Sequence, residues 1–343
     1  MTKFKPFIVL AALLFAVTLV VPALLVIPFT EGNVSGKLGE ELKKETKTGT
    51  AAEIPQGPAI EVGVYRLAQK KLETVPLEDY IAGVVASEMP AEFEEEALKA
   101  QALAARTFIV KQMMSKDSLE LPEGALVYDT VIHQVYKNDD ELKQQWKQDY
   151  KWKMEKVREA VTATRGQILT FDGSPITASF FSTSNGFTEN SEAIWPNSVP
   201  YLKSVESKWD LQSPKFNGRE VFTVQEFEKK LGVKLPNKST IGTVTERTAG
   251  QRVAKVDING KVVSGKDIRE KLGLKSTDFT WERKGDTIII NTQGYGHGVG
   301  MSQYGANGMA SEGKSYKEIV SHYYQGVEIA TSDQLLTKIT AKK

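Results

Sequence analysis

Glu88 occupies a position in which its carboxyl group would suit acid–base chemistry. Tyr80, Val84 and Glu88 are spaced four residues apart, so they share one stripe of an expected helix whose neighbouring positions are apolar. Pro90 disfavours a helical conformation for the residue before it, which places Glu88 in the last turn. Partial burial and the negative end of the helix dipole would both raise the pKa of Glu88. A carboxylic acid with a raised pKa can donate a proton near neutral pH.

From its position alone, Glu88 is more readily explained as a surface or ion-paired carboxylate than as a catalyst. The next expected helix begins near Glu94 and holds Arg106 among small apolar residues. An arginine in such a stretch is most often the buried partner of a carboxylate and less often a clamp for substrate. Both interpretations bring Arg106 near an acid such as Glu88.

Residues 179–192 form a polar loop, SFFSTSNGFTENSE. Its short hydroxyl and amide side chains stand beside Phe181 and Phe187, a composition that suits sugar hydroxyls and stacking on a sugar ring. Such loops are also commonly simple turns. No G-x-S-x-G motif is present, so a serine hydrolase triad is not indicated.

Residues 294–310 form a glycine-rich segment, GYGHGVGMSQYGANGMA. Its glycines do not match the spacing of a dinucleotide-binding loop. Alternating glycines allow positive φ angles and close approach of the backbone, so we interpret the segment as a tight path that presents side chains to a cleft. The alternative is a purely structural loop. The candidate side chains are His297, Ser302, Gln303 and Tyr304.

The elements that must position these residues favour the α+β class. No regular alternation of strand and helix recurs along the chain. Residues 210–286 are expected to form a smaller lobe that contains a strand pair joined at Asn259 and Gly260. Because the candidate segments lie on both sides of this lobe, we expect a cleft between two lobes. Strands are expected near Ile60, Ile168, Ile176, Val253 and Ile288.

Composition narrows the function classes. The 343 residues include 44 basic and 43 acidic side chains, so no overall field attracts nucleic acid. Cysteine is absent, which excludes disulfides, thiolate metal sites and a cysteine nucleophile. The 3 histidines do not have the short spacing of a zinc motif, and we expect no metal.

The N-terminus predicts a membrane anchor. Lys3 and Lys5 precede an uncharged apolar run at residues 7–29, which is long enough to cross a bilayer as a helix and is longer than the core of a signal peptide. We therefore expect an anchor at residues 1–29, with its N-terminus in the cytoplasm. A flexible linker at residues 30–57 and an extracytoplasmic domain at residues 58–335 would follow.

Several motifs together resemble the stage II sporulation protein D family. They are LEDYIAGVVASEMP, EALKAQALAARTF, FSTSNGFTENSE, PYLKSV followed by WD, and the glycine-rich segment, and they cover roughly residues 60–329. The resemblance implies a lytic transglycosylase that acts on septal peptidoglycan during forespore engulfment. It further implies a single-pass protein of the cell membrane at the sporulation septum, with stage II sporulation proteins P and M as partners.

The resemblance also assigns residues. The catalytic glutamate of the family falls on Glu88, and a lytic transglycosylase needs one carboxylate and no cofactor, whereas a hydrolase normally needs two carboxylates. Some relatives have a histidine and cysteines that suggest zinc, but this chain has Phe181 at the histidine position. The alternatives are a wall-binding activator of an amidase and a scaffold for membrane partners. Positions expected to line the substrate cleft are Arg106, Tyr201, His297, Ser302, Gln303 and Tyr304.

Overall fold

The computed structural model of the protein describes residues 60–115, 121–236 and 240–340. The predicted membrane anchor at residues 1–29 and the predicted linker at residues 30–57 lie outside the described residues. Within the described ranges, no helix combines the length and apolar character needed to cross a membrane. The described residues combine helices with small sheets, which confirms the predicted α+β class.

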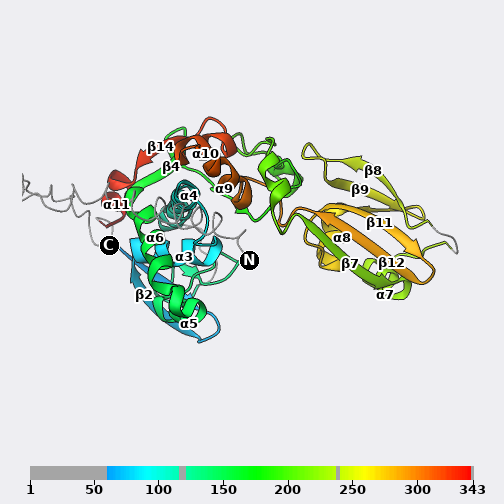
Figure 1. Cartoon of the computed structure of the whole chain (residues 1–343), viewed down its shortest axis with the longest axis horizontal. Coiled ribbons are helices and arrows are strands. Elements are labelled where there is room, and N and C mark those ends of the chain that lie inside the picture. Colours follow the sequence, from blue (N-terminus) through cyan, green and yellow to red (C-terminus); the bar gives the residue numbers. More distant parts are fainter. Residues whose placement is uncertain (1–59, 116–120, 237–239, 341–343) are drawn as a thin grey trace, which may run out of the picture. The chain divides into compact units, whose positions relative to one another are not determined.

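The long helix α4 (Glu95–Met114) lies at the centre of a helical region (Figure 1). Its alanine-rich sequence leaves room for close neighbours, and residues such as Ala97 and Ala104 are completely buried. Other helices and two strands pack against α4 and form the first hydrophobic core. The helices of this region are α3 (Leu77–Glu88), α5 (Asp139–Trp146), α6 (Tyr150–Ala163), α9 (Gln303–Ser311), α10 (Tyr316–Tyr323) and α11 (Asp333–Thr340).

Short sheets border this first core. β1 (Glu61–Arg66) pairs with β2 (Lys71–Pro76) in antiparallel orientation and with β3 (Val127–Tyr128) in parallel orientation. A second sheet has the order β14-β4-β5. The pair of β6 (Phe180–Phe181) and β13 (Met301–Ser302) joins the polar loop to the glycine-rich segment, which are far apart in the sequence. The strands of the second sheet are β4 (Gln167–Phe171), β5 (Ser174–Pro175) and β14 (Glu328–Thr331).

A second hydrophobic core lies between Phe227 and Ile290 in the sequence. Two antiparallel sheets, ordered β11-β12-β7 and β10-β9-β8, contribute to it together with two helices. Asn259 and Gly260 both have positive φ angles and form the turn between β9 and β10, as the sequence predicts. The elements are β7 (Asn217–Thr223), α7 (Val224–Leu231), β8 (Thr243–Arg247), β9 (Val253–Ile258), β10 (Lys261–Ser264), α8 (Gly265–Leu272), β11 (Asp278–Lys284) and β12 (Thr287–Gln293).

Candidate active site

Glu88 is the last residue of α3. The helix ends there because Met89, which precedes Pro90, is extended with φ −117° and ψ 141°. The Glu88 side chain is half-buried, and its Oε1 accepts a hydrogen bond of 3.0 Å from the backbone N–H of Val135. Burial raises the pKa of Glu88, while the Val135 hydrogen bond opposes that rise. The rise in the pKa of Glu88 that was expected from burial is therefore present.

Gln303 holds the end of α3 in place. Its side-chain Nε2 donates to the backbone carbonyl of Glu88 at 3.1 Å and lies 3.5 Å from Oε1 of Gln101 on α4. Carbonyls in the last turn of a helix lack partners within the helix, so this amide supplies one. Gln303 was expected to contact substrate. The structure instead buries it as a support for the backbone of Glu88.

Ser302 is also buried, which corrects its expected role in a substrate cleft. Its hydroxyl donates to Oδ1 of Asp210 at 2.6 Å and accepts from the N–H of Gly305, capping α9. Oδ2 of Asp210 accepts from Ser184 at 2.7 Å and from Ser207 at 2.6 Å. Asp210, in the short helix η4 (Lys208–Gln212), is fully buried, and burial raises its pKa. It thus ties the polar loop to the start of α9.

Asp210 belongs to the WD motif of the family resemblance, but the sequence indicates no role for it in the site. The available signal was an acid beside Trp209 that follows a loop rich in serine. A buried carboxylate needs several donors, and a loop with many hydroxyls can supply them. The spacing of those serines does not indicate to which carboxylate their hydroxyls donate hydrogen bonds.

His297 lies in the glycine-rich segment between two aromatic rings. The ring centroids of Phe181 and Trp195 are 5.7 and 5.9 Å from that of His297. Burial, with a smaller effect from Arg269 and Arg252, lowers the pKa of His297 to about 4. The imidazole is therefore neutral at physiological pH, and its Nδ1 accepts from the N–H of Val299 at 3.1 Å.

Tyr304, at the start of α9, remains partly exposed. Its ring meets that of Phe93 edge-on, with centroids 4.9 Å apart, and Nζ of Lys215 lies 5.7 Å from the Tyr304 centroid. Phe93 lies in the turn that follows α3. Tyr304 therefore stands beside the segment that leaves Glu88, in a position from which an aromatic face can contact a sugar.

Arg106 is completely buried, and its acidic partner is Glu78 rather than Glu88. Its Nη2 and Nε lie 2.7 and 3.1 Å from the two carboxylate oxygens of Glu78. Ten residues of helix separate Glu78 from Glu88, which is about 15 Å along α3. The expectation that Arg106 neighbours Glu88 is therefore wrong, and a buried guanidinium with these partners is a structural residue. Its other acceptors are Thr164 Oγ1 and the carbonyls of Val161 and Gln167.

Tyr201, which the sequence also places in the substrate cleft, is mostly buried in the structure. It is 9% exposed, and its hydroxyl accepts a hydrogen bond of 2.8 Å from the N–H of Thr177. Its ring packs against Phe171 with centroids 5.3 Å apart. These contacts make Tyr201 part of the first core.

The side chains that the structure describes around Phe181 do not fit a metal site. Phe181, at the position where some relatives were expected to have histidine, is buried and offers no ligand atom. Across residues 60–115, 121–236 and 240–340, no group of three or more His, Cys, Asp or Glu side chains is arranged to hold a metal ion. No metal-dependent step is therefore assigned to this site.

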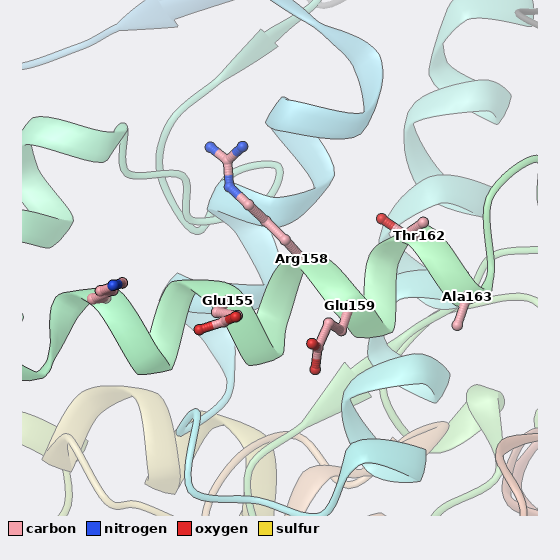
Figure 2. A pocket seen from close by; sticks show the side chains of 6 residues that line it. Glu155, Arg158, Glu159, Thr162 and Ala163 are labelled. Carbon is pink, nitrogen blue, oxygen red and sulfur yellow. The ribbon is translucent and has the colours of Figure 1, made fainter. Parts of the chain in front are cut away.

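A hollow of about 640 Å³ lies on the surface of α6, away from the candidate residues. Figure 2 shows Arg158 pointing to one side of this helix and Glu155 and Glu159 to the other. No residue that the sequence placed at the active site lines this hollow. Its lining residues are Lys151, Glu155, Arg158, Glu159, Thr162 and Ala163.

Comparison with known proteins agrees with the motifs. The family model described as stage II sporulation protein matches residues 65–171, which include Glu88. The chain is 53% identical to stage II sporulation protein D of Bacillus subtilis (strain 168), over 99% of this chain and 100% of that protein. It is 51% identical to the protein of the same name from Bacillus amyloliquefaciens, again over 99% and 100%. It is also 31% identical to the amidase enhancer of Bacillus subtilis (strain 168), over 73% of this chain and 40% of that protein. The chain therefore belongs to the stage II sporulation protein D family.

Proposed function

We propose that this protein is a lytic transglycosylase that cleaves peptidoglycan glycan strands between N-acetylmuramic acid and N-acetylglucosamine. The observation that carries the proposal is the half-buried carboxyl of Glu88, whose pKa is raised by burial at the end of α3. A carboxyl whose pKa is raised keeps its proton to a higher pH than an exposed carboxyl does, which suits it to act as a general acid. A single acid of this kind is sufficient for the reaction, which forms a 1,6-anhydro ring without consuming water.

Glu88 would act twice in the reaction. As an acid it gives its proton to the glycosidic oxygen while the bond from that oxygen to C1 of the muramoyl residue breaks. As a base the resulting carboxylate takes the proton of the C6 hydroxyl, whose oxygen bonds to C1 and closes the ring. The carboxyl ends in its starting protonation state, and no cofactor takes part. Gln303 would hold the end of α3 during both steps through its bond to the carbonyl of Glu88.

The cellular setting belongs to the same proposal. We infer a single-pass membrane anchor at residues 1–29 and an extracytoplasmic domain at the sporulation septum, because an apolar run follows two lysines in the sequence. Stage II sporulation proteins P and M would be the partners during engulfment. The substrate would bind in a cleft between the two lobes, with His297 and Tyr304 on its surface.

Product analysis tests the reaction. Purified glycan strands, intact and stripped of peptides, are digested with the full chain and with Glu88→Gln, and the products are identified by mass spectrometry. Anhydro-muramoyl ends are expected from the unchanged protein and not from Glu88→Gln. Glu92→Gln is the matched control because Glu92 is a nearby carboxylate that is 57% exposed. Equal yields from Glu88→Gln and the unchanged protein would refute the proposal.

A second function, activation of an amidase, is favoured by the relative that is named amidase enhancer. An activator would use its wall-binding surfaces and would not need the proton chemistry of Glu88. The distinguishing assay adds the chain to a purified cell-wall amidase and measures stem-peptide release from peptidoglycan. Stimulation that Glu88→Gln fully retains, together with the absence of anhydro-muramoyl ends, would favour activation over glycan cleavage.

A further inference from the structure

Two lysine side chains lie over the ring of Tyr295 in the glycine-rich segment, and Arg269 lies in the same region. Nζ of Lys275 lies 5.1 Å from the centroid of the Tyr295 ring, and Nζ of Lys215 lies 5.7 Å from it. Arg269, on α8, lies within electrostatic range of the same tyrosine. Tyr295 is 36% exposed, and both lysines are exposed. The cluster is therefore accessible to a ligand.

This cationic cluster lacks acidic partners. Among the residues that the structure describes, Lys215, Arg269 and Lys275 form no ion pair, although Glu270 acts electrostatically on Arg269 from the neighbouring position. Nε of Arg269 is buried without a hydrogen-bond partner. A buried donor without an acceptor costs free energy, and ammonium groups without acidic partners attract anions. A bound anion would supply the missing acceptor and the missing negative charge.

The cluster is continuous with the candidate active site. Lys215 lies over the rings of both Tyr295 and Tyr304, at 5.7 Å from each centroid, and so bridges the two tyrosines. Tyr304 directly follows Gln303, whose amide binds the carbonyl of Glu88. A strip of aromatic and cationic side chains therefore runs from the end of α3 to Lys275.

We propose that Lys215, Arg269 and Lys275, with the rings of Tyr295 and Tyr304, form a subsite that binds the carboxylate groups of the glycan substrate. The inference rests on the proposed function, since it takes peptidoglycan strands as the ligand. Ammonium and guanidinium groups attract carboxylates, and the tyrosine rings offer faces for the apolar side of a sugar. Two sources share this chemistry: the lactyl carboxylate of muramic acid in a stripped strand and the carboxylates of attached stem peptides.

The alternative is that the lysines only stabilise the loop through contacts with tyrosine rings. Such contacts contribute about 0.5–1 kcal/mol each at exposed sites, and a solvated ammonium retains them without any ligand. That alternative predicts that neutralising the lysines slightly lowers stability and leaves glycan affinity unchanged. Binding measurements therefore separate the two interpretations.

The test measures binding apart from catalysis. The full chain carrying Glu88→Gln is compared with the same chain carrying Lys215→Gln and Lys275→Gln in addition. Binding is measured for intact strands, peptide-stripped strands and neutral chito-oligosaccharides at low and high salt. The matched control carries Lys255→Gln and Lys284→Gln, which remove the same charge from lysines that are 56% and 66% exposed.

We expect the double lysine substitution to weaken binding of carboxylate-bearing strands about five- to thirtyfold at low salt, and less at high salt. Chito-oligosaccharide binding should stay as in the control. A loss confined to stripped strands identifies the lactyl carboxylate, and a loss confined to intact strands identifies the stem peptides. Unchanged affinity for both strands, or an equal loss for chito-oligosaccharides, would overturn the subsite. Because Glu88→Gln is used throughout, these outcomes are independent of whether the unchanged protein produces anhydro-muramoyl ends.

Discussion

Replacing Arg106 with alanine should destabilise the fold while sparing the chemistry proposed for Glu88. The Arg106 side chain is 0% exposed and its guanidinium reaches two oxygens of Glu78, one hydroxyl and two backbone carbonyls. Removing one partner of a buried ion pair typically costs about 3–5 kcal/mol. Because Glu78 is 24% exposed, water can partly solvate its carboxylate after the change. We therefore expect a loss near the lower end, about 3 kcal/mol of unfolding free energy.

The assay is urea unfolding of the full chain followed by circular dichroism. The control is Arg158→Ala on α6, because Arg158 is 48% exposed and its contacts with Asp79 and Asp139 are 3.6 and 3.3 Å long. An exposed pair of this kind contributes less than about 1 kcal/mol. A double-mutant cycle with Glu78→Gln should show strong coupling to Arg106.

Glycan cleavage is measured on the same proteins under conditions where all of them are folded. Arg106→Ala should then cleave within a few-fold of the unchanged protein. If Arg106→Ala instead keeps its stability within about 1 kcal/mol and loses cleavage by orders of magnitude, the buried structural assignment fails and Arg106 must contact substrate.

Three further changes test other contacts. Glu88→Gln should raise the free energy of unfolding at neutral pH, because burial raises the pKa of Glu88 and so destabilises its ionised form in the folded protein. This gain in stability should shrink as the pH falls through the raised pKa, and it should vanish below the ordinary value of 4.5. Gln303→Ala should lower kcat about two- to tenfold with little change in KM, as initial cleavage rates would show, whereas a change confined to KM would indicate substrate contact. Gly298→Ala should lower the free energy of unfolding, measured in urea, by about 1–3 kcal/mol more than Gly285→Ala does. Both glycines have a positive φ, but only the new Cβ at Gly298 would meet another side chain, that of Arg252 at 2.8 Å. Equal losses in the two variants would contradict this packing argument.

The membership of this chain in the stage II sporulation protein D family guides which form of the protein and which activities these experiments should use. Its similarity to two proteins of that name extends over nearly the whole chain, so the full chain is the appropriate protein for each assay. The amidase enhancer relative matches over a smaller share of its own length. Glycan cleavage and amidase activation therefore need to be measured on the same preparations.

Local features of the sequence determined where Glu88 lies. Pro90 restricts the residue before it, so α3 had to end at this point, and the apolar spacing of Tyr80, Val84 and Glu88 placed the carboxyl on a buried stripe. Burial of that stripe raises the pKa of Glu88, as the sequence predicted. The turn at Asn259 was equally predictable. Each of these features depends on residues that are close in the chain.

Only the tertiary structure decided which side chains meet across the chain. Arg106 needed a carboxylate, but whether Glu78 or Glu88 supplied it depended on how α3 and α4 pack against each other. Asp210 accepts hydrogen bonds from the hydroxyls of Ser184, Ser207 and Ser302, and it buries Ser302 in this way. Gln303 is buried against the carbonyl of Glu88. Periodicity fixes which face of a helix is buried, whereas the partner on that face is fixed by packing between elements. The sequence therefore determined where the Glu88 carboxyl lies along α3, and the fold determined the residues that contact it.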